Sequence, residues 1–203
     1  GVSSVAPNDP ATVRPGGTFF SDDDARNIPN PMILQANFNV AGDKSLTLSG
    51  AITQTNNRGF NNNIASPGML ILSGQLTIWE DDEALVREFD FLGSGTTMIT
   101  AVIRDDPQNS GNDRRLNQRG PGVLIIDVDQ GDNFHSGPTT ITNGNFHYAD
   151  NASLNVGPGL ILSRGGAIGV DTGVANNSTF AAKIDPASFG GLMIAPSDAA
   201  AHL

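Results

Sequence analysis

Apolar and small polar residues alternate in short runs from residue 32 onward, and glycine, asparagine and other turn-forming residues separate the runs. Alternation of this kind is typical of β-strands that bury one face. The clearest runs are residues 45–53, 69–78, 98–103, 123–128, 139–142, 145–148, 153–156, 160–162 and 192–194. Two segments depart from this pattern: residues 80–91 have an apolar side that predicts a helix, and residues 195–203 are a weaker helical candidate. The rest of the chain is predicted to be all-β.

Three strands are expected to begin after a Pro-Gly pair, at Pro67, Pro121 and Pro158. Proline presets the first position of a turn, and we expect the glycine to supply the positive φ of the second. The pairs are 54 and 37 residues apart, so no single repeat length fits. A recurring turn-and-strand unit that is too small to bury its own face predicts a compact β-solenoid of stacked sheets. The alternative is a β-sandwich or jelly roll that reuses one turn type.

Residues 1–31 differ from the rest of the chain. They contain 5 of the 12 prolines and the acidic run 22–24, with Phe19 and Phe20 as their main apolar anchors. This composition predicts an extended, Pro-rich arm that packs on its own domain or on a neighbouring copy. Residues 32–203 are expected to form one all-β domain.

Composition narrows the possible classes of protein. The 203 residues include 24 Gly, 12 Pro and no Cys, and the formal charge is −10. Turn formers prevail over helix formers, which argues against an all-helical protein, and the deficit of Lys and Arg argues against binding of DNA or RNA. The lack of Cys excludes disulfides, zinc knuckles and thiol catalysis. It is compatible with a location outside the cell.

The chain contains no apolar stretch near the roughly 20 residues of a membrane-spanning helix, and no signal sequence. It begins at Gly1. We therefore expect either a mature protein whose export signal has been removed or a trimmed fragment.

The region from Gly120 to Gly173 resembles the autotransporter-associated β-strand repeat of bacterial surface proteins. The matching segments are 122–126, 132–146 and 152–157, and residues 45–53 are similar to another strand of the same repeat. The region from Gly120 to Gly173 and residues 45–53 together span about a third of the chain. Phe146 stands where the family usually has Leu, and residues 79–119 depart from the pattern. The resemblance implies an exported, right-handed β-helix with a structural or adhesive role and no catalytic residues.

Several oxygen-bearing side chains cluster after the strand at 123–128. Asp127, Asp129, Asp132 and Asn133 are candidate calcium ligands, because hard cations prefer carboxylate and amide oxygens. The alternative is a solvated turn rich in Asp and Asn. The acidic run 22–24 is a further candidate, and the segment 165–171 is faintly similar to a glycine-rich calcium repeat.

Candidate catalytic residues are few, and we predict that the chain is not an enzyme. The histidines are His135, His147 and His202, and the first two fall in runs where alternation could place them on a strand surface. No nucleophile elbow, zinc-protease motif or phosphate loop is present. Four carboxylates could serve a carbohydrate-active β-helix enzyme, although paired Asp residues are usually turn formers: they are Asp81, Asp82, Asp105 and Asp106.

Four of the nine arginines fall in the segment 104–119 of an otherwise acidic chain. An arginine-rich loop can dock on an acidic face of another copy through bidentate pairs, or it can form local ion pairs of little energetic value. The predicted self-assembly contacts are Phe19, Phe20, Arg104, Arg114, Arg115 and Arg119. Asn151 and Asn177 lie in glycosylation sequons, which an Asn-rich chain also produces by chance.

These features favour an extracellular structural protein. We expect a self-assembling subunit of a surface layer, filament or matrix, with adhesion as a further role and edge-to-edge strand addition as the mechanism. Its main partner would be other copies of itself, with a glycan as a candidate partner and Ca²⁺ as a candidate ligand. The alternatives are a carbohydrate-binding or carbohydrate-active β-helix protein and a viral capsid or fibre protein.

Overall fold

The computed structural model describes residues 11–13, 17–79, 86–105, 113–128, 135–149, 161–171 and 178–195. In this part of the chain the strands form a β-solenoid of about six turns, built from stacked parallel sheets. The predicted all-β solenoid is confirmed.

The strands form three faces, which we call sheets A, B and C. Sheet A contains β1 (Ala11–Val13), β4 (Met32–Leu34), β7 (Ile52–Thr55), β10 (Leu76–Trp79) and β13 (Ile103–Asp105). Sheet B contains β2 (Thr18–Ser21), β5 (Phe38–Gly42), β8 (Arg58–Ile64), β11 (Arg87–Leu92), β14 (Arg114–Gln118), β16 (Thr139–Ile141) and the first part of β18 (Ile161–Asp171). Sheet C contains β3 (Arg26–Ile28), β6 (Leu46–Leu48), β9 (Met69–Leu72), β12 (Thr96–Ile99), β15 (Val123–Ile126), β17 (Asn145–Tyr148), the second part of β18, and β19 (Phe189–Ala195).

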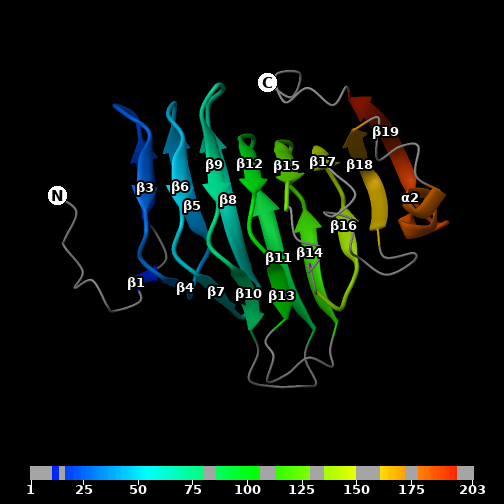
Figure 1. Cartoon of the computed structure of the whole chain (residues 1–203), viewed down its shortest axis with the longest axis horizontal. Helices are drawn as coiled ribbons and strands as arrows, with labels where there is room; N and C mark the ends of the chain where they lie inside the picture. The colour runs from blue at the N-terminus through cyan, green and yellow to red at the C-terminus, as the bar shows by residue number, and fades with distance from the viewer. Residues whose placement is uncertain are drawn as a thin grey trace.

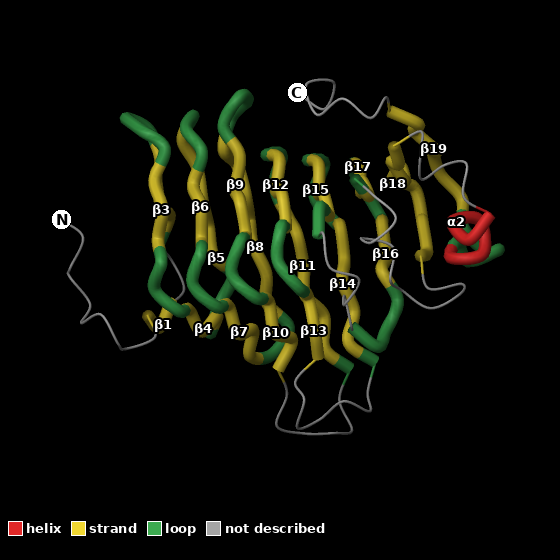
Figure 2. The backbone as a smooth tube through the Cα atoms, in the orientation of Figure 1, coloured by secondary structure: helices red, strands yellow, loops and turns green. Residues whose placement is uncertain are grey.

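Figure 1 shows the strands stacked along the longest axis of the chain, with β1 and β3 near one end and β18 and β19 at the other. The helix α2 (Ser178–Lys183) lies beside β19 at that second end, as Figure 2 shows in red. No helix in the described part of the chain is long and apolar enough to cross a membrane.

The spacing between equivalent residues varies from one turn to the next. Phe38 faces Phe60, 22 positions later, whereas Phe60 faces Phe91, 31 positions later. In sheet C, Met69 faces Thr96 and Thr96 faces Val123, each 27 positions later. The two Pro-Gly pairs that precede β9 and β15 are therefore 54 residues apart because they are separated by two turns of the solenoid. The third pair lies outside the described residues and precedes β18, which begins in sheet B.

The glycines of the Pro-Gly pairs have a different role from the one expected. Neither Gly68 nor Gly122 has a positive φ. Instead, a Cβ on Gly68 would lie 2.7 Å from the carbonyl oxygen of Asp43, and one on Gly122 would lie 2.2 Å from that of Gly95. Glycine is required there because the backbones of neighbouring turns approach too closely for a side chain.

The core is a set of ladders in which each turn contributes one side chain to each column. In sheet B, Phe38, Phe60 and Phe91 stack in register, with ring centroids 5.7 Å and 6.2 Å apart. All three rings are buried. Aromatic pairs at these separations contribute attraction beyond the area that they bury.

Several predicted elements differ from the structure. Residues 87–91, expected in a helix, belong to β11, because Phe89 and Phe91 alternate into the core while Glu88 and Asp90 lie between them. Residues 80–85 of that segment lie outside the described residues, as do 196–203 of the second helical candidate. The runs 45–53 and 69–78 each contain two strands separated by a corner. Gly50 lies at the corner of the first run and Gly74 at the corner of the second, and a Cβ on Gly74 would lie 1.8 Å from the carbonyl oxygen of Gly50.

The segment predicted as an arm contributes strands to the solenoid. β2 pairs with β5 and β3 pairs with β6, both parallel and in register. β1 pairs with β4 in the same way. The described part of residues 1–31 therefore forms the first turn of the stack.

Candidate functional site at the two ends of the solenoid

Exposed aromatic residues mark the first turn. Phe19 and Phe20 lie on β2, the terminal strand of sheet B, and Phe20 is 67 % exposed. The ring of Phe19 stacks on Phe38 with centroids 4.6 Å apart and an interplanar angle of 25°. Phe19 is in register with Val40, so its ring reaches diagonally to the first ring of the phenylalanine ladder, and the side chain remains 39 % exposed.

Apolar side chains are also exposed at the opposite end. Phe189 is 65 % exposed and Leu192 is 58 % exposed, and Met193 is exposed as well. All three lie on β19, which in the described part of the chain pairs only with β18. The sequence predicts the strand at 192–194 but not its place at an end of the stack. The signal for that place is an aliphatic run after which the described chain has no further strand.

The helix α2 covers the sheet B side of this end. Phe180 is buried and belongs to the hydrophobic core. Beyond the helix, the backbone N–H of Asp185 donates to the carbonyl of Ile161 at 2.8 Å, and Ser188 Oγ accepts from the N–H of Ser163 at 3.1 Å. Edge groups at the start of β18 are therefore satisfied within the chain.

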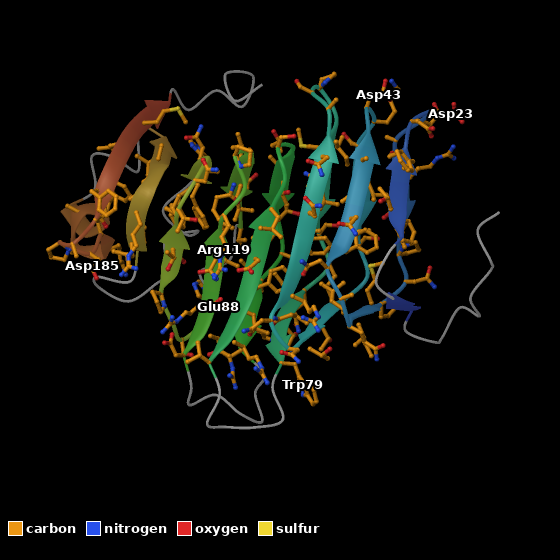
Figure 3. All side chains as sticks on the ribbon, turned by 180° about the vertical axis from the view of Figure 1, so that it is seen from behind. Asp23, Asp43, Trp79, Glu88, Arg119 and Asp185 are labelled. Carbon is orange, nitrogen blue, oxygen red and sulfur yellow. The ribbon has the colours of Figure 1, made fainter. Side chains whose placement is uncertain are left out.

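Between the two ends, the outer face of sheet B carries a network of ion pairs. Arg119 pairs with Glu88 and with Asp90, and Arg115 pairs with Asp113 and, at 3.9 Å, with Glu88. Figure 3 shows Arg119, one residue after β14, close to Glu88 of the adjacent β11. Burial raises the pKa of Asp90, while Asn117 and Arg119 oppose that rise. Such partly exposed pairs contribute little to stability.

In the described part of the segment predicted as an arginine loop, residues 104–105 belong to β13 and residues 114–118 form β14. Arg104 is exposed on β13, whereas Arg115 and Arg119 take part in the ion pairs just described. Arg114 begins β14 and is fully buried, so its side chain lies inside the chain and not on an exposed knob. The alternation of β14 causes this difference, since Arg114, Leu116 and Gln118 share the inward face. An interface role for the exposed arginines stays a prediction.

Two buried polar side chains, Asp105 and His135, lie at the end of β13 and in the segment that leads into β16. Asp105 Oδ2 accepts from the backbone N–H of Ser136 at 2.9 Å. His135 Nε2 lies 3.0 Å from Thr139 Oγ1. Burial raises the pKa of Asp105 to about 6 and lowers the pKa of His135 to about 4. Neither His135 nor His147 lies on a strand surface, since both are buried.

The predicted metal ligands are only partly described. Asp127 is half-buried just after β15, while Asp129, Asp132 and Asn133 lie outside the described residues. Among the residues that are described, no group of three or more His, Cys, Asp or Glu side chains could hold a metal ion. The exposed run 22–24 lies between β2 and β3. Calcium binding stays a prediction for 127–133.

The remaining candidates from the sequence fall mostly outside the described residues. These are Asp81, Asp82, Asp106, Asn151, Asn177 and His202. Asp105, the member of the carboxylate set that is described, is buried and not open to a substrate.

Comparisons with protein-family models, with characterised proteins and with solved structures find no match to this chain. The resemblance to the autotransporter repeat therefore stays a prediction. The two ends of the solenoid are the arrangement in the described chain that best supports a functional proposal.

Proposed function

We propose that this protein is an extracellular structural subunit that associates with copies of itself. The observation that carries the proposal is the location of the exposed apolar side chains. Of the large ones exposed in the described chain, all but Val86 lie on the terminal strands β2 and β19. Between these two strands, most large apolar side chains are buried in the core ladders, and the outer face of sheet B carries ion pairs.

The physical reason is the cost of an open sheet edge. A terminal strand in a parallel stack presents backbone N–H and C=O groups that a further strand can satisfy, and proteins that remain monomeric usually protect such edges. Here apolar side chains accompany the edges. Joining two ends would remove both the unpaired backbone groups and the exposed rings from water.

The position of the aromatic rings favours assembly over recognition of a sugar. Phe19, Phe20 and Phe189 lie at the ends of the stack. A sugar-binding groove would instead place rings along a side face, with polar partners beside them. The Cys-free and acidic composition supports a location outside the cell.

Sedimentation velocity over a series of protein concentrations tests the proposal. We expect the weight-average mass to increase with concentration and the assembled fraction to dissociate on dilution. A chain that remains monomeric at its highest soluble concentration, at low and high salt and with or without Ca²⁺, would contradict self-assembly.

A further inference from the structure

The columns of sheet C run unbroken from one end of the solenoid to the other. One column begins at Arg26 on β3, passes through buried positions that are apolar except at Thr97, and ends at Leu192 on β19: its members are Arg26, Leu46, Leu70, Thr97, Leu124, Phe146, Ile168 and Leu192. Leu46 and Ile168 are buried, whereas Leu192 is 58 % exposed. Leu192 therefore occupies a core position that no later strand of the described chain covers.

A second column has the same form. It begins at Ile28 and ends at Ile194: its members are Ile28, Leu48, Leu72, Ile99, Ile126, Tyr148, Val170 and Ile194. Ile28 is only partly buried, although it packs against the core. Ile28 is thus a core position that no earlier strand of sheet C covers among the described residues. The two ends of sheet C are complementary in register, because each lacks the neighbour that the other supplies.

The backbone of β3 leaves groups available for such a neighbour. Arg26 N–H donates to Ser45 O and Ile28 O accepts from Ser49 N–H, both at 3.0 Å, so these residues bond toward β6. In a parallel ladder alternate residues bond to opposite sides. The N–H and C=O of Asn27 consequently point away from β6, toward the open edge.

We propose that β19 of one copy pairs in parallel with β3 of the next, which continues sheet C across the junction and rests on the proposed self-assembly. In this register Leu192 lies opposite Arg26, Met193 opposite Asn27, and Ile194 opposite Ile28. Leu192 then contacts the aliphatic stem of Arg26, whose charged group reaches water. The partner recognised at each end is a second copy of this chain.

The other half of the junction fits the same geometry. Sheet B cannot be extended at the C-terminal end, because α2 and the turn after it already satisfy the start of β18. The exposed Ala181 and Ala182 of α2 offer a small apolar surface there. Phe19 and Phe20 of the next copy would cover that surface while the strands of sheet C pair.

The junction joins two different surfaces, so it is heterologous. Such contacts repeat without closing unless a rotation brings the last copy back to the first. The products are therefore directional filaments in which every copy has the same orientation. A symmetric dimer, joined through two β19 strands or two β3 strands, is a different arrangement and is excluded by the proposal.

Two blocked variants test the direction of assembly. Asn27→Pro removes the outward N–H of β3 but leaves the bonds from Arg26 and Ile28 to β6, and Leu192→Asp places a charge at the core position of β19. Thr100→Asp, at an exposed position between the ends, is the matched control. Circular dichroism and thermal melting establish that each variant is folded.

We expect each blocked variant to be monomeric alone and an equal mixture to form a 1:1 dimer and nothing larger. The open β19 of the Asn27→Pro chain then meets the open β3 of the Leu192→Asp chain. Thr100→Asp should assemble like the wild type. A mixture that remains monomeric, or a dimer of either variant alone, overturns the register while the wild type still assembles. A wild type that never assembles overturns the proposed function itself.

Cross-linking provides a measurement that does not depend on the blocked variants being folded. The chain has no Cys, and opposite residues in neighbouring strands are close enough for a disulfide. The double variant Asn27→Cys, Met193→Cys should give a ladder of multimers on a non-reducing gel. The control Thr100→Cys, Met193→Cys should give at most dimers. Equal ladders from both proteins would contradict the register.

Discussion

Asp105 Oδ2 accepts a hydrogen bond from the backbone N–H of Ser136 at 2.9 Å, although the two residues are 31 positions apart in the chain. The contact ties the end of β13 to the segment that leads into β16. The carboxyl is buried, and its partner Ser136 directly follows His135, whose imidazole is buried as well. These two groups should respond to pH in opposite directions.

The folded state raises the pKa of Asp105 from 3.8 to about 6, so between these values the folded chain keeps a proton that the unfolded chain releases. Stability from this group falls as pH rises through that window. The folded state lowers the pKa of His135 from 6.5 to about 4, so stability from this group falls as pH decreases from 6.5 to about 4. The two contributions largely cancel in the wild type.

We therefore predict that Asp105→Asn, which retains an oxygen acceptor for Ser136, makes the free energy of unfolding fall more steeply from pH 6.5 to 4 than in the wild type. His135→Gln should produce the opposite change in slope. Urea denaturation at a series of pH values measures both. Three parallel stability curves would show that neither group is perturbed by burial as described.

The phenylalanine ladder is expected to account for a large share of stability. Phe60 is buried between Phe38 and Phe91, so Phe60→Ala should lower the free energy of unfolding by about 3–5 kcal/mol. Phe20→Ala removes an exposed ring and should change it by about 0.5 kcal/mol or less in the monomer. Denaturation below the concentration of assembly makes the comparison. Similar losses in both variants would contradict the ladder.

Close approach of neighbouring turns predicts a penalty at Gly122. A methyl group there would lie 2.2 Å from the carbonyl oxygen of Gly95, whereas Gly17 has no atom within 4 Å of the same position. Gly122→Ala should cost about 1–3 kcal/mol, because the backbone must shift to admit it. Gly17→Ala is the matched control, and we expect little loss from it. Thermal unfolding of the two variants side by side distinguishes them.

The buried amide of Asn62 is expected to hold one corner between sheets B and C. Its Nδ2 donates to Thr96 O at 2.8 Å and to Thr97 Oγ1 at 3.0 Å, and its Oδ1 accepts from Ile64 N–H at 3.0 Å. Asn62→Ala should lower stability by about 1–3 kcal/mol, since it leaves buried polar groups unsatisfied. The neighbouring exposed Asn63→Ala serves as the control. A larger loss at Asn63 than at Asn62 would contradict this assignment.

The sequence predicts the fold class well because buried and less buried side chains alternate with a period of two residues in most strands, even though the spacing between turns varies. The aliphatic strands at 69–72 and 123–126 appear where they were expected. β8 was not expected, because Asn61, Asn62 and Asn63 have the composition of a turn. In the structure Asn61 Nδ2 donates to Oδ1 of Asn39 on the neighbouring strand β5 at 3.0 Å, and Asn62 Nδ2 donates to the carbonyl of Thr96. These contacts join different turns of the solenoid, so the local sequence does not show them, and they outweigh its preference for a turn.

The candidate site was predicted in part. The aromatic pair at 19 and 20 was singled out from its isolation in a polar segment, and the structure places it on a terminal strand. The sequence does not show that β19 is a terminal strand of the described stack, because that depends on how many turns precede it. Arg114 was expected on the surface, but only the register of β14 against β11 shows that its side chain faces inward.

The unequal spacing between turns has a consequence for engineering. Phe60 and Phe91 remain in register although 31 residues separate them, whereas 22 separate Phe38 from Phe60. The strands set the pitch and the connections absorb the difference in length. The number of residues between two strands should therefore be open to redesign without a change in the register of the ladders, so that connection length and core can be engineered separately.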